Sequence, residues 1–566
     1  MAESRTESRA ELTTSQRQWG ADGGVRLAGQ RGWADKWHMR FAPVLLCWSL
    51  LCVAAEPAKK LKVFILAGQS NMEGQAVVDL TGRDYNEGKG TLVDVMSRPG
   101  AAGRYAHLKD KDGKWVVRPD VWVRYQRENH PLQAGPLALG FGAYVSQHHF
   151  GPEFQFGHVV GAAYRDQVLL IKTAWGGKSL YRDFRPPSAG GEVGPYYLKM
   201  VAEVREALAN LKKDFPAYDG AQVELAGFVW YQGWNDGVNP KAAVPEYEQN
   251  LAHLIRDVRK EFGVPKLPVI VGELTGPWVD APKEWTALRQ AQANVADYPE
   301  FKDNVLFVPT RTFVRKPQDS PNPGHGHHEF GNAETYFLVG DALGKAAVQM
   351  AGRDRQVRQI RGWTLRIDER LIAKDAATVE KAVGLLDAQL AKVERLIPAQ
   401  AVARLRSVPL NFSLPYPDRR PTAEYHGGLA WVKQVGREIA LAKAIEFTNV
   451  DRFEPEIRRM PVLVLHELAH AYHDQVIPGG YQNKDILAAY RQAKAAGTYD
   501  AVKRWTGEKY VETPTKAYAM TNQMEYFAEV TEAYFDRNDM EPFDLTELKA
   551  KDPTVVPVLE KVWGVR

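Results

Sequence analysis

Cysteine is almost absent from this 566-residue chain, which contains only Cys47 and Cys52. Both lie in one short apolar run near the N-terminus, so the rest of the chain has no cysteine with which to form a disulfide. Its stability must therefore come from hydrophobic cores rather than from a disulfide framework. With 45% hydrophobic residues, the chain has enough material for about two or three such cores.

A strong charge of one sign is also absent, because the formal net charge is +4. Nucleic-acid-binding proteins usually carry a larger basic excess or a clustered basic stripe. Neither feature is present, so we expect no nucleic-acid partner. The chain lacks internal repeats, and residues 1–38 are polar with neither helical nor strand periodicity.

The apolar run at 41–55 has the properties of a signal peptide. It follows Met39 and Arg40, is too short to span a bilayer, and ends in small residues. We therefore predict a signal peptide at 39–55, a mature chain that begins near Glu56, no membrane span, and a secreted or periplasmic protein. On this interpretation Met39 is the true start, and residues 1–38 are an over-called extension.

Five apolar runs predict buried strands, at 61–67, 168–171, 223–230, 267–271 and 305–308. Amphipathic segments such as 196–211 and 247–262 lie between some of them. Strands that alternate with helices predict an α/β fold with a parallel sheet and helices on both faces. In such sheets the ligand lies beyond the carboxyl ends of the strands. Residues 75–150 read as a long irregular insertion that either covers the active site or decorates the surface.

The second half of the chain is predicted to be mainly helical. Helical periodicity is strong at 375–396, and further helices are expected at 459–476, 484–496 and 522–536. The basic segment after a closing helix at 334–350 lacks hydrophobic periodicity. We therefore expect a first domain at 58–352, a linker at 353–370 and a second domain at 371–566.

A serine follows the first predicted strand directly, within the string Gly68-Gln69-Ser70-Asn71-Met72. At a strand-to-helix turn a serine hydroxyl can act as a nucleophile, and nearby backbone N–H groups can bind a developing oxyanion. The alternative is a serine that only caps a helix. The pattern therefore indicates a site for acyl transfer without excluding a structural role.

This string resembles the nucleophile block of the sialate O-acetylesterase-like carbohydrate esterases, a branch of the SGNH hydrolases. The resemblance runs from about 61 to 350 and implies a flavodoxin-like sheet, an acetylated carbohydrate substrate and no cofactor. It also implies Ser70 as the nucleophile. Gly151, in Gly-Pro-Glu, and Gln232, in Trp-Tyr-Gln-Gly, correspond to the oxyanion-hole donors. Trp234 stands where the family has glutamate.

The same resemblance places the catalytic histidine in the segment 326–334. The register of the family's final block favours His328 as the general base, with His327 and then His325 as alternatives. These enzymes often carry an aspartate three residues before the histidine, and here that position is His325. Candidates for the orienting carboxylate are Asp319 and Glu329, and a dyad without a carboxylate is the alternative.

Several aromatic side chains near these blocks could stack on sugar rings, although packing in the core is the competing role. They are Trp175, Trp230, Tyr231 and Trp234.

A second pattern, His466-Glu467-Leu468-Ala469-His470, lies on the predicted helix at 459–476. Residues four apart share a helix face, so His466 and His470 can hold one metal ion. Glu467 can then accept a proton from a water molecule on that ion. Zn²⁺ is the expected metal, and a catalytic zinc site requires a third protein ligand. The alternative is a buried helix with two unrelated histidines.

Residues 522–529 resemble the Glu-Phe-Phe-Ala-Glu segment of the anthrax-lethal-factor-like metallopeptidases. The resemblance covers about 371 to 562 and implies a mainly helical α+β, gluzincin-like domain that cleaves protein or peptide. It implies Glu525 as the third zinc ligand, Glu529 in a supporting role, and Tyr518 as a residue that stabilises the transition state. Glu525 could instead reach back to an Asn522 N-cap.

His473, one turn beyond His470, is the alternative third ligand or a residue that supports the ligands.

We therefore predict a secreted bifunctional hydrolase: a serine carboxylesterase that deacetylates carbohydrate, joined to a zinc-dependent peptidase. The alternative is a carbohydrate-binding or adhesion protein with a decayed esterase and a structural zinc domain. The residues at positions 234 and 325 favour this alternative, because both depart from the esterase pattern.

Overall fold

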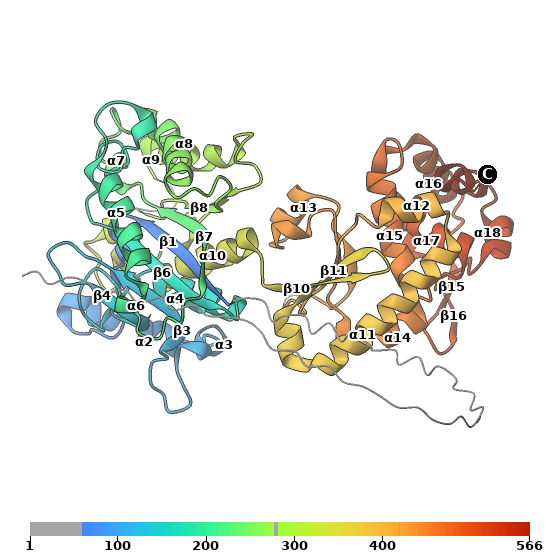
Figure 1. Ribbon diagram of the computed structural model, residues 1–566, viewed down its shortest axis with the longest axis horizontal. Coiled ribbons are helices and arrows are strands. Elements are labelled where there is room, and N and C mark those ends of the chain that lie inside the picture. The colour runs from blue at the N-terminus through green and yellow to red at the C-terminus, as the bar shows by residue number, and fades with distance from the viewer. Residues whose placement is uncertain (1–58, 277–280, 418, 566) are drawn as a thin grey trace, which may run out of the picture. The chain divides into compact units, whose positions relative to one another are not determined.

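The computed structural model describes residues 59–276, 281–417 and 419–565. The predicted extension and signal peptide, at 1–38 and 39–55, lie outside the described residues. Two large sheets are present, one within 60–308 and the other within 355–447 (Figure 1). No helix in the described ranges is long and apolar enough to cross a membrane.

The first sheet has seven strands in the order β4-β3-β6-β1-β7-β8-β9, and all neighbouring pairs are parallel except β3 with β4. All five predicted strands are confirmed. They are β1 (Lys60–Gly68), β6 (Gln167–Ala174), β7 (Gln222–Tyr231), β8 (Val269–Gly272) and β9 (Val305–Val308).

The insertion at 75–150 is less irregular than predicted, because it contributes β3 (Arg118–Tyr125) and β4 (Gln133–Leu137) to this sheet. Charged residues hid β3 in the sequence. Arg124 is buried within the strand, where it pairs with three carboxylates, those of Glu203, Glu206 and Asp214. A buried arginine that is fully paired is compatible with a central strand, although its charge interrupts the apolar pattern.

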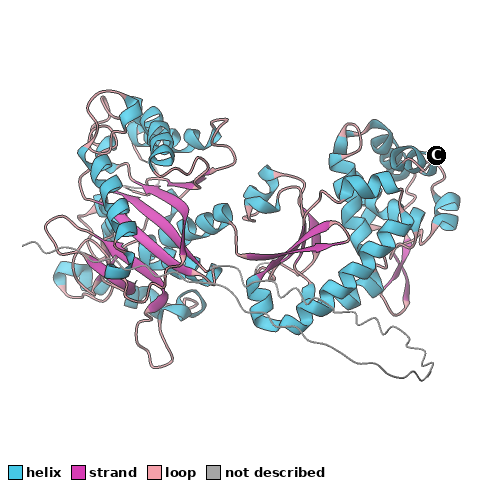
Figure 2. Cartoon of the chain, in the orientation of Figure 1, coloured by secondary structure: helices cyan, strands magenta, loops and turns pink. Residues whose placement is uncertain are grey.

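Helices cover both faces of the sheet (Figure 2). Phe64 and Leu66 pack with α4 (Glu153–Ala163) and α10 (Ala333–Ala351), whereas Val63 and Ile65 pack with α5 (Pro195–Ala209), α8 (Val244–Glu261) and α9 (Lys283–Asn294). Successive side chains of a strand point to opposite faces, so β1 is buried on both sides. The predicted parallel sheet between helices is therefore confirmed.

Short elements complete this part of the chain. They are α1 (Ser70–Glu73), β2 (Ala76–Val77), α2 (Leu92–Ser97), α3 (Ala102–Tyr105), β5 (His149–Phe150), α6 (Leu211–Asp214), α7 (Trp234–Gly237) and the 3₁₀ segment η7 (Gly326–Gly331).

The predicted linker at 353–370 is wrong, because these residues form the hairpin of β10 (Arg355–Ile360) and β11 (Trp363–Asp368). Trp363, Leu365 and Ile367 alternate toward the core. Arg361 and Gly362 make the turn with positive φ angles, a conformation typical of tight hairpins. The partner strand β10 is mostly half-buried and carries Arg355 and Arg358, so the segment lacked an obvious apolar pattern. The hairpin belongs to a five-stranded sheet that also contains β12 (Leu410–Phe412), β14 (Ile445–Phe447) and β13 (Ala423–Tyr425).

The remainder of the second part is helical, as predicted. Its main helices are α11 (Glu369–Leu396), α15 (Leu463–Gln475), α16 (Lys484–Ala495) and α17 (Gln523–Phe535). Smaller elements are α12 (Ala399–Leu405), α13 (Leu429–Gln434), α14 (Phe453–Arg459), β15 (Val502–Trp505), β16 (Tyr510–Thr515), α18 (Leu545–Lys551) and α19 (Val556–Trp563). Every residue from Leu463 to His473 is buried, so α15 lies inside its core rather than on the surface.

Candidate functional sites

Ser70 begins α1 directly after β1, at the carboxyl end of the parallel sheet. Two glycines bracket this turn because neighbouring backbone leaves no room for a side chain. A Cβ at Gly68 would lie 2.2 Å from the carbonyl oxygen of Tyr231, and one at Gly74 would lie 1.9 Å from the Cα of Gly151. The turn that carries Ser70 is therefore held tightly between β7 and the loop at Gly151.

The Ser70 side chain makes no hydrogen bond to another described residue, and in particular none to an imidazole. Its backbone N–H also has no partner among the described residues. Ser70 is only 6% exposed, so both groups border a sheltered space. This N–H is therefore available to bind a developing oxyanion.

His328 lies on η7, which contacts α1 through a hydrogen bond from the Asn71 amide to Glu329, 3.2 Å long. The Nε2 atom of His328 is 3.3 Å from Nε2 of Gln75. Burial lowers the pKa of His328 to about 3, and the nearby rings of His327 and His325 add to the effect. The imidazole is therefore neutral near pH 7, which a general base requires, but its basicity is low.

Neither carboxylate proposed to orient His328 contacts its ring. Asp319 is exposed, and its carboxylate forms no hydrogen bond or ion pair with a described residue. Glu329 is buried and accepts hydrogen bonds from Asn71 and from the Gly276 N–H. These hydrogen bonds hold its carboxylate at Asn71 and Gly276, and none joins it to the His328 ring. In this structure neither carboxylate is therefore in a position to orient the His328 ring by a hydrogen bond.

Two of the predicted oxyanion donors are already occupied. The Gly151 N–H donates to Glu153, which pairs with Lys172 at 2.6 Å in a fully buried ion pair. The Gln232 amide nitrogen lies within hydrogen-bond distance of three acceptors, on Gln69, Lys178 and Asp236. Buried polar groups need such partners. Of the three donors, only the Ser70 N–H is free.

The aromatic residues separate into core and rim positions. Trp175, Trp230 and Tyr231 are at most 1% exposed, so they pack in the core and cannot stack on a sugar. Trp234 is half-buried and lies against Trp285, with ring centroids 4.7 Å apart. Only Trp234 of the four retains a surface that a ligand could reach.

Glu73 is a site residue that the sequence reasoning missed. A Cβ added at Gly176 would lie 3.1 Å from Glu73 Oε2 and 3.6 Å from Ser70 Cβ, so both side chains border the same glycine. Tyr125 donates a hydrogen bond to the other carboxylate oxygen at 2.9 Å, and burial raises the pKa of Glu73. The sequence offered one signal for Glu73, its position three residues after Ser70. The two side chains share a face only if this segment is helical.

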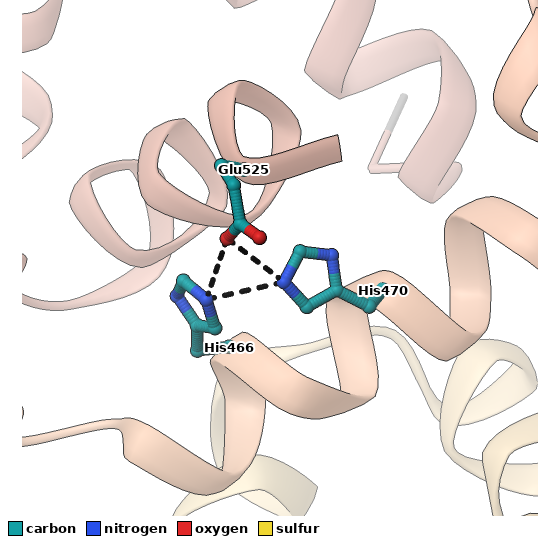
Figure 3. Close-up of side chains that lie close together, drawn as sticks. All are labelled: His466, His470 and Glu525. Atoms are coloured by element: carbon teal, nitrogen blue, oxygen red, sulfur yellow. Dashed lines mark hydrogen bonds and ion pairs between the residues drawn. The ribbon is translucent and has the colours of Figure 1, made fainter. Parts of the chain in front are cut away.

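The second cluster forms where α17 packs against α15 (Figure 3). Glu525 Oε2 lies 3.4 Å from His466 Nε2 and 3.2 Å from His470 Nε2, and the two nitrogens are 3.2 Å apart. Asn522 caps α17 by accepting from the N–H groups of Met524 and Glu525. The Glu525 carboxylate is thus turned to the histidines instead of reaching back to the cap.

These three atoms fit a zinc ion. Zinc–ligand bonds of about 2.0–2.1 Å in a tetrahedron place neighbouring ligand atoms about 3.3 Å apart. The three observed separations are 3.2, 3.2 and 3.4 Å, and Glu525 Oε2 is a buried oxygen without a hydrogen-bond partner. The donor set of two imidazoles and one carboxylate suits zinc and leaves a fourth position open.

Glu532, which the sequence reasoning missed, holds one of the histidines. Its Oε1 lies 2.6 Å from His466 Nδ1, and it is completely buried. Glu529, which was expected to support the site, accepts a hydrogen bond from Asn538, and one of its carboxylate oxygens also lies within 4.8 Å of His466 and Glu532. Residues 525, 529 and 532 lie on one helix face at three- and four-residue spacing. The sequence therefore could not show which of Glu529 and Glu532 bonds to a histidine.

The remaining predicted residues surround this cluster. Glu467 is 6% exposed, and burial raises its pKa. Tyr518 is 51% exposed, and burial together with the charge of Glu525 raises its pKa to about 12. His473 is fully buried against Phe527 and Tyr481 and does not join the group of ligand atoms.

Comparisons with known proteins assign a similarity to the first part of the chain. Residues 60–333 match the family model described as a carbohydrate esterase, sialic acid-specific acetylesterase. Among solved structures, a protein from Arabidopsis thaliana has 17% identity and a TM-score of 0.33, covering 52% of this chain and 98% of that one. A carbohydrate acetylesterase from Xanthomonas citri has 14% identity and a TM-score of 0.33, and the match covers 52% of this chain and 59% of that one. No curated protein matches.

Replacement of Glu329 by glutamine should remove a pH dependence of stability. Burial raises the pKa of Glu329 from 4.5 to about 7, so the fold favours the protonated form. That contribution is complete below pH 4.5 and is lost as the pH rises through 7. A glutamine retains the acceptor oxygen for Asn71 and cannot ionise. At pH 8 we expect Glu329→Gln to exceed the wild type by up to about 3 kcal/mol in unfolding free energy.

Denaturant unfolding at pH 5 and pH 8, followed by circular dichroism, measures this difference. Identical pH dependence in the two proteins would show that Glu329 ionises without cost.

Replacement of Glu532 by glutamine should weaken zinc binding. The carboxylate fixes the His466 ring and makes it a better ligand, and loss of such a partner typically lowers affinity about 10- to 100-fold. Glu529→Gln is the matched control, because Glu529 is equally buried on the same helix but bonds to Asn538. Competition with a zinc chelator measures both affinities, and an equal loss in the two variants would contradict the assignment.

Proposed function

We propose that this chain is a secreted two-site hydrolase. Its first part would be a serine carboxylesterase that removes O-acetyl groups from carbohydrate, and its second part a zinc-dependent peptidase of gluzincin-like architecture. The family match over residues 60–333 supports the first activity. The triangle formed by His466, His470 and Glu525 is the observation that carries the second. Secretion or export to a periplasm rests on the apolar run at 39–55.

In the proposed esterase, Ser70 attacks the ester carbonyl while His328 accepts the hydroxyl proton and later returns it to the departing sugar oxygen. The Ser70 N–H is free to stabilise the negative charge that develops on the carbonyl oxygen. Formation of the Ser70–His328 hydrogen bond requires a rearrangement, because the two side chains are not hydrogen-bonded in this structure and His328 is paired with Gln75. Trp234, at the rim, offers a surface to the carbohydrate.

In the proposed peptidase, His466, His470 and Glu525 would hold the zinc ion. Bound zinc would polarise the peptide carbonyl and activate water for attack. Glu467, next to the first ligand on α15, accepts the proton of the attacking water and passes it to the leaving amine. Tyr518 is exposed beside the cluster, and its phenol can donate a hydrogen bond to the carbonyl oxygen as negative charge develops there.

A second candidate function is carbohydrate binding without turnover. The occupied donors at Gly151 and Gln232, together with the absence of a carboxylate on His328, favour a decayed esterase. In that case the zinc cluster would have a structural role. Tight binding of an acetylated glycan that is recovered unchanged would select this function over the first.

Replacement of Ser70 by alanine should abolish esterase activity only. Because Ser70 is the nucleophile of the proposed acyl transfer, we expect hydrolysis of 4-nitrophenyl acetate to fall by at least about 10³-fold. Hydrolysis of a casein substrate by the same preparation should be unchanged. Esterase activity equal to the wild type would eliminate the proposed nucleophile.

Replacement of Glu467 by glutamine should abolish peptidase activity and leave one zinc per chain. Glutamine has the shape of glutamate but cannot accept the proton, so we expect a loss of about 10²- to 10⁴-fold in casein cleavage. Zinc content by mass spectrometry and ester hydrolysis serve as controls and should not change. A variant that retains cleavage would refute the general-base role, and a wild type without zinc would refute the metal site.

A further inference from the structure

The ring of the candidate base His328 is hydrogen-bonded to Gln75. Its Nε2 is 3.3 Å from the amide nitrogen of Gln75, and this is the only side-chain hydrogen bond of its ring among the described residues. We propose that Gln75 is a specificity-determining residue of the esterase site, which occupies the base until a hydroxyl group of the substrate pairs with the Gln75 amide and releases His328. This inference rests on the proposed esterase function.

The chemistry of the two groups defines the direction of this hydrogen bond. An amide nitrogen can only donate, so Nε2 of His328 must accept, and a neutral ring then carries its proton on Nδ1. The nitrogen has one lone pair, and while Gln75 donates to it the hydroxyl of Ser70 cannot. The elements that carry the two residues, α1 and η7, are in contact.

Gln75 is itself held from the other side by Tyr144, whose hydroxyl donates to the Gln75 Oε1 at 3.3 Å. Tyr144 is 50% exposed, and its ring lies edge-on to His149 with centroids 4.7 Å apart. The N–H of Ala143 donates to the carbonyl of Gly74 at 2.7 Å, which ties this loop to the end of α1. The insertion at 75–150 thus delivers an exposed phenol and an amide to the candidate base.

The titratable groups around His328 do not compete for Nε2. The His327 ring lies 4.0 Å away, centroid to centroid, and His325 lies 5.6 Å beyond His327. Tyr336 donates to the backbone carbonyl of His328, and Glu329 is bonded to α1. Gln75 therefore has to be displaced by the substrate rather than by a change of partner within the protein.

A substrate displaces this amide at least cost if it satisfies the amide in return, because the half-buried Gln75 amide loses a hydrogen bond when it leaves His328. A sugar hydroxyl beside the ester can accept from the Gln75 nitrogen and donate to its oxygen. An aryl acetate or a fully acetylated sugar offers no such donor. We therefore expect a preference for partially acetylated sugars that carry a free hydroxyl next to the acetyl group.

The test compares two substrates in one variant. Gln75→Ala should raise kcat/KM for 4-nitrophenyl acetate about 2- to 10-fold, the amount that one neutral hydrogen bond provides. The same variant should lower kcat/KM for a methyl glycoside mono-acetate by a similar factor. Tyr144→Phe should change kcat/KM for each substrate in the same direction as Gln75→Ala, but by a smaller factor. The rate at which a fluorophosphonate labels Ser70 should rise in Gln75→Ala, which gives a readout without turnover.

Gln290→Ala and Tyr298→Phe are matched controls, since their side chains bond to Asn294 and Glu248 away from the site. Neither control should change kcat/KM for either substrate. An equal loss of kcat/KM on both substrates in Gln75→Ala, or no change on either, would overturn the role of Gln75. If Ser70→Ala is inactive in the same assays, the proposed esterase function stands despite that result. Full activity of Ser70→Ala would instead overturn the proposed function itself.

Discussion

The second half of the chain depends on one electrostatic constraint, which is the burial of several carboxyl groups beside His466 and His470, around α15 and α17. Burial raises the pKa of three of them, Glu467, Glu529 and Glu532, so their ionisation is costly. The carboxylates there are Glu467, Glu525, Glu529, Glu532 and Asp539. Only Asp539 has a close arginine partner, Arg459. Buried charges are stable when they are paired or when they coordinate a metal. A divalent cation between the two imidazoles and Glu525 would add positive charge to this cluster, and it would account for the buried Glu525 oxygen that has no hydrogen-bond partner.

The first half depends on hydrogen bonding rather than on charge excess. Nearly every polar group around Ser70 is committed: Gly151 to a buried ion pair, the Gln232 amide to three acceptors, and His328 to Gln75. The two groups of Ser70, its hydroxyl and its N–H, are the ones left free. In the proposed esterase, such a site would couple Ser70 to His328 only after Gln75 has given up its hydrogen bond to the ring.

Local patterns were sufficient to predict much of this. The apolar runs predicted the parallel strands because a strand buried on both faces must be apolar throughout, and the spacing of His466 and His470 predicted a shared helix face. The strand at Arg124 and the hairpin at 355–368 were missed, because charges paired by distant residues conceal a strand. The contacts of Glu532 with His466 and of Gln75 with His328 could not be predicted from the sequence either, since each joins segments that only the folded chain brings together.

The account is tested most directly by zinc X-ray absorption spectroscopy on the purified full-length protein. We expect one zinc per chain with nitrogen and oxygen ligands at about 2.0–2.1 Å and outer-shell scattering from two imidazoles. A protein that retains no zinc after exposure to it, or a spectrum without imidazole scattering, would contradict the claim that α15 and α17 form a metal site.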